Sequence, residues 1–259
     1  MPIPSSKWSL HKFYSKHSTI RKHLPATAIF RFVTLKDFLG KYHTIYVKPD
    51  REHRGKGIVK VWKNGKIYKL VHEKGQVSHS QTIQDVYRKI RRRSLNQRYI
   101  VQQAIPLTKV RGRVFDIRVM MMRNAKGSWQ YAGMVSKVAG TNSIVTNVAR
   151  GKGYVLKVEQ ALHRTGLFHG QRVNEIQKRL ISLSYQIANY FNRYKRSSQI
   201  GVDYGVDSKG NIRIIEVNFD FPSHSLFAKL PDKKAYYRIR SLAQAYKASR
   251  RKKKQQKSG

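Results

Sequence analysis

The chain has 259 residues, enough for one large domain or two small lobes, and its 40% hydrophobic content indicates a globular protein. Cysteine is absent, which excludes disulfides and thiol catalysis, and no apolar run approaches the roughly 20 residues of a membrane span. Lysine and arginine total 54 against 13 aspartates and glutamates, so the formal net charge is +41 and the partners are expected to be anionic. Without a signal-peptide pattern, we expect a cytoplasmic protein with no membrane partner.

The first hundred residues predict a small lobe rich in strands. A basic stretch over residues 5–20, with Trp8, Phe13 and Ile20, predicts a short helix. We assign residues 1–30 to this N-terminal helix and its linker, and residues 31–97 to the smaller lobe. Strands are predicted over residues 44–49, 58–62 and 66–71, and a helix over residues 82–93.

Residues 98–245 predict a larger lobe of helices and strands. The predicted strands cover residues 99–103, 113–123 and 129–138, and an apolar stripe predicts a helix over residues 173–195. Asp232 can cap a final helix that runs to Tyr246. The basic residues 246–259 are expected to be a disordered tail, because like charges at that density oppose compaction.

Two of the few acids lie in apolar, strand-like surroundings near the end of the larger lobe. A four-residue loop over 208–211 would place Asp203 directly opposite Glu216, and Asn218 would share the face of Glu216. Two carboxylates and an amide oxygen are ligands that suit Mg²⁺. The alternative is that both acids pair with lysine or arginine, and for an isolated pair of acids we favour that alternative.

The smaller lobe contains a candidate phosphate clamp. Lys48 ends a predicted strand, and the charged loop after it includes Arg54, Gly55, Lys56 and Gly57. Glycine lets backbone amides approach an anion closely, and the cations neutralise it. In a chain this basic, such a loop is weak evidence when taken alone.

The predicted strand over residues 99–103 ends in two amides, Gln102 and Gln103. Its backbone can offer donors and acceptors to a purine edge, as the hinge between two nucleotide-binding lobes does. The smaller lobe therefore contains candidates for both phosphate and base contacts.

The order of these features, with Asp116-Ile117-Arg118 between the hinge and the acidic hairpin, resembles the ATP-grasp superfamily of carboxylate–amine ligases. The match runs from about residue 7 to residue 230. The acidic hairpin and residues 223–226 are similar to D-alanine–D-alanine ligase. Asp116 to Arg118, with Asn147 and Arg150, is similar to the ribosomal-protein glutamate ligases. The opening residues and the run 46–49 resemble the spore-coat-associated YheC/YheD branch.

This resemblance implies an α/β (α+β) ATP-grasp fold of two α+β lobes with nucleotide between them, lacking the usual N-terminal domain. The implied contacts to ATP are Lys48, Arg54, Gly55, Lys56, Gly57, Gln102, Gln103 and Ile105. The implied ligands of two Mg²⁺ ions are Asp203, Glu216 and Asn218. The implied catalytic residues, facing the γ-phosphate and the acyl group, are Asp116, Arg118, Asn147 and Arg150. Lys7 and Lys12 compete for the place of a further phosphate-binding lysine.

The resemblance also implies an ATP- and Mg-dependent carboxylate–amine ligase that acts through an acyl phosphate, with an acidic small molecule, peptide or polymer as substrate. Without the usual N-terminal domain, the substrate site would be open, completed by a partner that supplies the missing domain, or lost. The alternative is a catalytically degenerate basic module that binds nucleic acid or an anionic spore-coat component in a spore-forming bacterium. We favour the enzyme, because a module without catalysis has no need of Asp203, Glu216 and Asn218 together.

Overall fold

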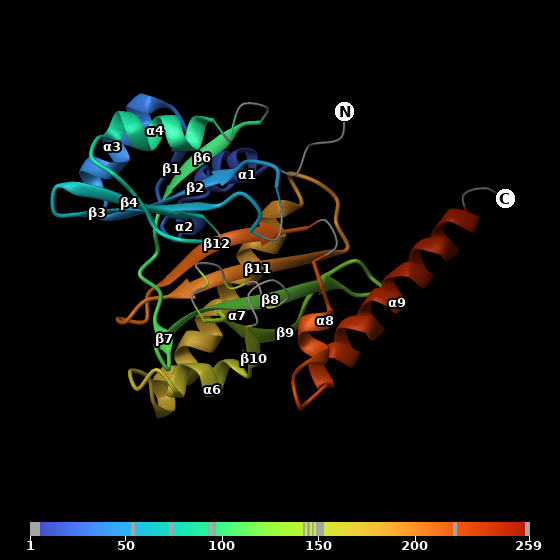
Figure 1. Ribbon diagram of the computed structural model, residues 1–259. Coiled ribbons are helices and arrows are strands. Elements are labelled where there is room, and N and C mark those ends of the chain that lie inside the picture. The colour runs from blue at the N-terminus through green and yellow to red at the C-terminus, as the bar shows by residue number, and fades with distance from the viewer. Residues whose placement is uncertain are drawn as a thin grey trace. The chain divides into compact units, whose positions relative to one another are not determined.

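The computed structural model describes residues 6–52, 55–72, 75–92, 94, 97–141, 143, 146, 148, 153–219 and 222–256, and of Lys254 the backbone alone (Figure 1). The chain divides into two compact units. The first unit contains Pro4–Pro106 and Ala139–Gly153, and the second contains Leu107–Val138 and Tyr154–Gly259. In the part of the chain that is described, no helix is long and apolar enough to cross a membrane.

The first unit is built on a six-stranded antiparallel sheet with the order β1-β6-β2-β3-β4-β5. Its strands are β1 (Thr27–Ile29), β2 (Thr44–Pro49), β3 (Val59–Asn64), β4 (Ile67–His72), β5 (Ser78–Ser80) and β6 (Tyr99–Gln103). Because β6 pairs between β1 and β2, the first unit extends past residue 97, where the sequence had placed the division.

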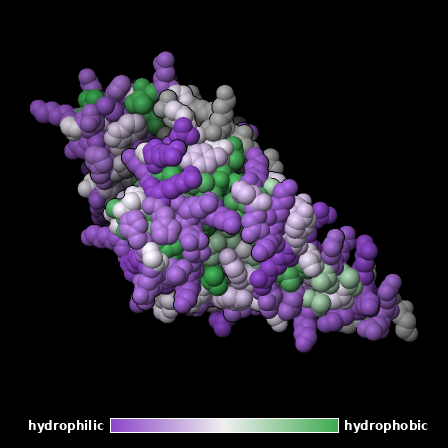
Figure 2. Space-filling view, turned by 90° about the horizontal axis from the view of Figure 1, so that it is seen from below, coloured by the Kyte–Doolittle hydropathy of each residue, from purple (hydrophilic) through white to green (hydrophobic). Residues whose placement is uncertain are grey.

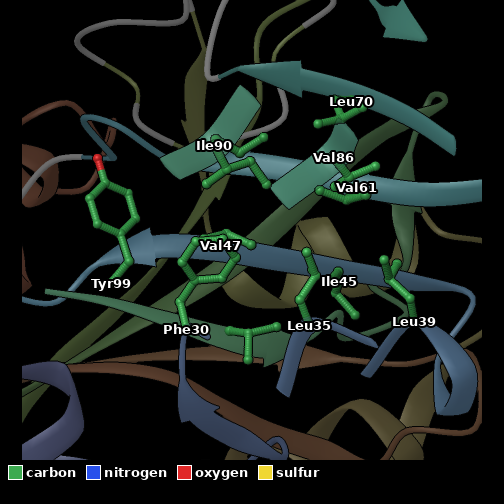
Figure 3. Packing of buried hydrophobic residues seen from close by; sticks show 12 residues of the cluster. Phe30, Leu35, Leu39, Ile45, Val47, Val61, Leu70, Val86, Ile90 and Tyr99 are labelled. Atoms are coloured by element: carbon green, nitrogen blue, oxygen red, sulfur yellow. The ribbon is translucent and has the colours of Figure 1, made fainter. Parts of the chain in front are cut away.

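One face of this sheet carries the core of the first unit. Along β2 the burial alternates, so that Ile45 and Val47 are buried while Tyr46 and Lys48 lie on the opposite face. The helices α3 (Phe32–Lys41) and α4 (Ile83–Arg91) contribute apolar side chains to this core. In Figure 3, Leu35 and Leu39 of α3 and Val86 and Ile90 of α4 lie around the valines and isoleucine of the strands.

The predicted N-terminal helix is two helices, α1 (Lys7–Ser15) and α2 (Ser18–Arg21). The side chain of His17 caps the start of α2 by accepting from the N–H of Ile20, which interrupts the helix. Leu10, Tyr14 and Ile20 are buried, whereas Trp8 and Phe13 are half-buried. The apolar face thus differs from the one expected at Trp8 and Phe13.

The second unit is built on an antiparallel sheet with the order β10-β9-β8-β11-β12, with β7 added beside β8. Its strands are β7 (Lys109–Val110), β8 (Arg113–Arg123), β9 (Trp129–Val138), β10 (Tyr154–Leu156), β11 (Gln199–Val206) and β12 (Ile212–Asn218). The helices are α6 (Val158–His163), α7 (Gly170–Phe191), α8 (Ser225–Ala228) and α9 (Lys234–Gln255).

Helices cover both faces of this second sheet. The hydroxyl of Tyr204 on β11 lies 2.8 Å from Ser184 Oγ of α7, so α7 covers the face to which Tyr204 points. On the other face, α8 and α9 pack on an apolar cluster of Met120, Met122, Ala132, Val135, Phe227, Leu230 and Ile239. Successive strand residues point to opposite faces, so Asp203 lies on this second face, beyond the apolar cluster.

Helix α9 runs to Gln255, through residues that were expected to be disordered from 246 onward. Lysine, arginine, alanine and glutamine are good helix formers, and lengthening an existing helix is far less costly than starting one. Gly133 of β9 lets α9 approach closely, because a Cβ at that position would lie 2.6 Å from the Cβ of Ala235. The expectation of a tail that begins at Tyr246 is therefore corrected.

Candidate functional site

The structure confirms that Asp203 and Glu216 lie directly opposite each other on β11 and β12. The loop between the strands is residues 207–211, one residue longer than expected. Asp207 Oδ1 accepts from the N–H groups of Lys209 and Asn211, at 2.9 Å each, which closes this longer turn. The register then shifts beside Asp203, and this irregularity restores the expected pairing.

Three neighbouring strands bring four buried charged side chains together. Arg118 on β8 is directly opposite Asp203, and Asp116 shares its face two residues earlier. Lys137 on β9 is directly opposite Asp116. We call Asp116, Arg118, Lys137 and Asp203 the charge cluster. Each of these residues is at most 8% exposed.

The two cations of the charge cluster both bind Asp203. Arg118 donates from Nε to Asp203 Oδ1 at 2.5 Å and from Nη2 to Oδ2 at 2.8 Å, a bidentate pair. Lys137 Nζ lies 3.0 Å from Asp203 Oδ1 and 3.0 Å from Asp116 Oδ1. Two acids and two bases make the formal charge of the cluster zero. Pairing of an acid with lysine and arginine, the alternative weighed from the sequence, is thus present at Asp203.

The environment of the cluster keeps Asp203 ionised. Burial raises the pKa of this carboxyl, but Arg118 and Lys137 outweigh burial and lower the pKa to about 2. Burial lowers the pKa of Arg118, and the attraction of Asp203 reverses that effect and raises it. Both groups therefore carry their charges throughout the physiological pH range.

Gly201 makes room for Arg118. A Cβ at Gly201 would lie 3.0 Å from Arg118 Cδ, 3.1 Å from Arg118 Nη1 and 2.9 Å from the Cβ of Pro222. The arginine side chain passes over this glycine on its way to Asp203. Gly201 was missed from the sequence, because the crossing depends on which strands are neighbours.

Glu216 and Asn218 lie at the edge of the charge cluster and are half-buried. Asn218 donates from Nδ2 to Asp203 Oδ2 at 3.3 Å, so its Oδ1 is the atom that could bind a cation. Glu216 is close enough to attract Arg118. Within the described ranges, no three His, Cys, Asp or Glu side chains are arranged to hold a metal ion. The residues fit Mg²⁺ in part: Glu216 and Asn218 offer oxygens, whereas both oxygens of Asp203 are already engaged.

In the first unit, two of the predicted nucleotide contacts touch each other. Lys48 donates from Nζ to Gln102 Oε1 at 2.6 Å, and Nζ also lies 5.4 Å from the centre of the Tyr46 ring. Gln102 donates from Nε2 to Thr27 Oγ1 at 3.0 Å. This polar cluster lies on the sheet face opposite the core.

The other predicted hinge residues lie differently. Gln103 points to the opposite face from Gln102, because successive strand residues alternate, and its Oε1 accepts from the N–H of Ala26 at 3.4 Å. Ile105 follows the end of β6 and is half-buried. The roles expected for Gln103 and Ile105 remain predictions.

The loop after β2 has the backbone expected of a glycine loop. Gly55 and Gly57 have φ of 77° and 74°, a region that favours glycine, and Lys56 between them is exposed. The side chain of Lys7 donates to the carbonyl of Glu52 in this loop. Lys12, the other candidate of the first helix, lies 5.9 Å from the centre of the Trp8 ring. Lys7 is therefore the one of the two lysines that binds the loop.

Comparison with known proteins agrees with this geometry. Residues 3–249 match the family described as YheC/D like ATP-grasp. The chain belongs to this ATP-grasp family. It is 22% identical over 229 residues to the endospore coat-associated protein YheD of Bacillus subtilis (strain 168). The matched region covers 86% of this chain and 49% of YheD. The chain thus spans about half the length of that curated relative.

Solved ATP-grasp structures show the same fold. VanG D-Ala:D-Ser ligase from Enterococcus faecalis has a TM-score of 0.56 at 15% identity, over 93% of this chain and 61% of that one. The N5-carboxyaminoimidazole ribonucleotide synthetase purK, solved as an ADP complex, has a TM-score of 0.55 at 14% identity, over 92% and 51%. The α+β fold with two antiparallel sheets is that of the ATP-grasp superfamily.

Three residues predicted for the candidate site lie outside the described residues: Arg54, Asn147 and Arg150. Lys137, in contrast, is a site residue that the sequence analysis missed. Its signal was the single charged residue of the predicted strand 129–138, the same kind of signal that led to Asp203. The charge cluster provides two buried cations and the edge of the site provides acceptor oxygens, a combination suited to charged phosphoryl groups.

Proposed function

We propose that the chain is an ATP- and Mg-dependent carboxylate–amine ligase that forms an acyl-phosphate intermediate. The observation that supports this most is the charge cluster beside Glu216 and Asn218 in an ATP-grasp fold. Burying two acids and two bases has a desolvation cost that a hydrophobic core would avoid. A fold that served only to bind polyanions on its surface would gain nothing from that cost.

The proposed chemistry depends on neutralising negative charge. A carboxylate oxygen of the substrate bonds to the γ-phosphorus while the bond to ADP breaks, and an amine then attacks the acyl carbon and releases phosphate. Arg118 and Lys137 are cations that can stabilise charge on the phosphoryl group, with Asp116 holding Lys137 in position. Lys48 and Gln102, with Lys56 and the glycines of the loop, would hold ATP.

Magnesium, when bound, would neutralise and orient the phosphates. In the observed arrangement of side chains, Glu216 and Asn218 are the residues that would hold the ion. A second ion at Asp203, expected from the family resemblance, would require Arg118 and Lys137 to release that carboxylate.

The substrate class is proposed from charge. At +41 the chain attracts anions over long range, which favours an acidic peptide or polymer as the carboxylate substrate. A partner that completes the substrate site is part of the proposal. The name of that relative supports a spore-associated role for a protein made in the cytoplasm.

The test is turnover with Mg·ATP, a panel of acidic peptides and a panel of amines, measured as ADP release and as mass gained by the product. We expect Glu216→Gln to reduce turnover about 100-fold, the size seen when one electrostatic contact to a transition state is removed. Glu159→Gln, the same chemical change at an exposed position of α6, should leave turnover unchanged. Absence of ADP release across both panels, or full turnover in Glu216→Gln, would contradict the proposal.

A second function, polyanion binding, is favoured by helix α9. Residues 234–255 contain no acid, and their lysines and arginines are Lys234, Arg238, Arg240, Lys247, Arg250, Arg251, Lys252, Lys253 and Lys254. Like charges three or four residues apart destabilise a helix, so a bound polyanion would stabilise this one. Hydrophilic side chains also cover most of the face shown in Figure 2.

This second function predicts binding to duplex nucleic acid without sequence preference and with a steep loss of affinity between about 50 and 200 mM salt. Changing Arg250, Arg251, Lys252 and Lys253 to glutamine should weaken binding and reduce the salt slope. The matched control changes four exposed cations elsewhere, at Arg21, Lys36, Lys41 and Lys126. Equal losses in both variants would mean that net charge, rather than α9, determines binding.

A further inference from the structure

The space between two buried carboxylates of the charge cluster is taken by a lysine. Lys137 Nζ lies 3.0 Å from Asp116 Oδ1 and 3.0 Å from Asp203 Oδ1. Two carboxylates this close repel each other unless a cation or a proton lies between them. In many enzymes that cation is a metal ion, and here the chain supplies it from β9.

The hydrogen bonds at Asp203 leave a metal ion little room. An ionised carboxylate has about four acceptor positions. Oδ1 accepts from Arg118 Nε at 2.5 Å and is 3.0 Å from Lys137 Nζ, and Oδ2 accepts from Arg118 Nη2 at 2.8 Å and from Asn218 Nδ2 at 3.3 Å. Mg²⁺ needs oxygens at about 2.1 Å in octahedral geometry, so it could bind Asp203 only after one of these donors had left.

The charge balance leads to the same conclusion. The charge cluster is formally neutral, and its side chains are 4% to 9% exposed. A divalent ion added between Asp116 and Asp203 would leave an excess of buried positive charge. Glu216 is half-buried, is close enough to attract Arg118, and adds one negative charge to this formally neutral cluster.

We propose that Lys137 takes the place of a metal ion between Asp116 and Asp203, and that a metal ion arriving with the nucleotide binds at Glu216 and Asn218 without Asp203. Glu216 and Asn218 are two residues apart on β12 and share a face. Mg²⁺ commonly keeps several waters and uses one or two carboxylates, so a site with two protein oxygens is sufficient when phosphates complete it.

This inference rests on the proposed function in one respect, the assumption that a metal ion binds beside the charge cluster. Its test measures metal binding without turnover, so either one can fail alone. A chain that never releases ADP could still bind manganese as predicted, and an active ligase could still bind it at Asp203.

The first test is Mn²⁺ binding without nucleotide, measured by electron paramagnetic resonance, in wild type and in Lys137→Met. We expect at least a tenfold increase in affinity in Lys137→Met, because Asp116 and Asp203 lose their shared cation. Adding Asp203→Asn to that variant should abolish the gain. Lys126→Met, the same change in the turn between β8 and β9, should match wild type. A Lys137→Met protein that folds and binds Mn²⁺ no more tightly than wild type would overturn the inference.

A second test uses the wild-type protein, so it does not depend on Lys137→Met folding. Crystals grown with Mn²⁺ and a non-hydrolysable ATP analogue would locate the ion by anomalous scattering. The expected peak lies beside Glu216 and Asn218, with Lys137 still between Asp116 and Asp203. A peak bound to Asp203, or the absence of any peak beside Glu216, would overturn the inference.

Discussion

Two buried aspartates, one in each unit, are each bound by an arginine but differ in their other partners. Asp50 follows β2 in the first unit and is 1% exposed, and Asp203 lies in β11 of the second unit and is 4% exposed. In residue type and in burial the two are alike. Their partners separate a residue that holds the fold together from one that belongs to a site.

The partners of Asp50 are those of a structural anchor. Ser6 Oγ lies 2.9 and 2.8 Å from its two oxygens, and the N–H of Trp8 donates to it at 2.8 Å. Arg98 donates from Nε at 2.8 Å, but the side chain of Arg98 is 45% exposed. The carboxylate thus satisfies the start of α1, where a negative charge also interacts favourably with the helix dipole.

The partners of Asp203 are themselves buried charges. Arg118 and Lys137 are each 9% exposed in their side chains. Asp116 lies opposite Lys137, and Glu216 lies opposite Asp203. Such a group has a high desolvation cost, which stability alone does not explain. The comparison indicates that a buried acid marks a candidate site when the charges around it are buried as well.

The largest expected difference between the two aspartates is in stability. Asp203→Asn leaves Arg118 and Lys137 without their shared counter-charge and should lower the free energy of unfolding by about 3–5 kcal/mol. Asp50→Asn keeps an acceptor for Ser6 and Trp8, and its arginine is partly in water, so about 1–3 kcal/mol is expected. Urea unfolding at neutral pH would measure both changes. Equal losses of stability in the two variants would contradict the distinction between Asp50 as a structural residue and Asp203 as a site residue.

A smaller effect is expected from the glycine beneath Arg118. Gly201→Ala places a Cβ against Arg118 and Pro222 and should lower the free energy of unfolding by about 1–3 kcal/mol. Gly40→Ala in α3 is the matched control, because no atom lies within 4 Å of the new Cβ, and it should raise stability by about 0.5–1 kcal/mol. Thermal unfolding of both variants would test this. Tolerance of alanine at position 201 would contradict the described path of Arg118.

The smallest expected effect is on how the stability contributed by Asp50 depends on pH. Burial raises the pKa of Asp50, but hydrogen bonds from Trp8, Arg98 and Ser6 outweigh burial and lower it from the ordinary value of 3.8. A carboxyl with a lowered pKa stabilises the fold above the ordinary value and loses that contribution as the pH falls through the folded pKa. The stability advantage of wild type over Asp50→Asn should therefore shrink below about pH 4. An advantage that stays constant down to about pH 2 would contradict this.

Much of the fold could be predicted because its long elements carry clear periodicity. The apolar stripe of α7 and the long strands β8 and β9 follow from local pattern. Helix α3 was missed: it contains Gly40, and its N-cap residue is Arg31, which is not one of the usual capping residues. Strands β1, β5 and β10 have three residues each, too short for a periodic pattern, and are held by their neighbours in the sheets.

The candidate site was predictable only in part, because it depends on which strands are neighbours. Asp203 and Glu216 belong to one hairpin, and they lie opposite each other because a register shift beside Asp203 offsets a loop one residue longer than predicted. Arg118 and Lys137 reach Asp203 only because β11 lies beside β8 and β8 beside β9. That order is set by contacts between residues far apart in the sequence, so Lys137 and Gly201 could not be recognised as neighbours of Asp203.

The most direct test of the central claim, a working ATP-grasp nucleotide site, is Mg·ATP binding by calorimetry at about 0.3 M salt, where loose attraction of polyphosphate to a basic surface is screened. Lys48→Ala and Glu216→Gln would be compared with wild type and with Lys63→Ala, a change at an exposed lysine of β3. We expect saturable binding in wild type and Lys63→Ala, weakened at least tenfold in Lys48→Ala and Glu216→Gln. Weak binding that is equal in all four proteins would contradict the claim.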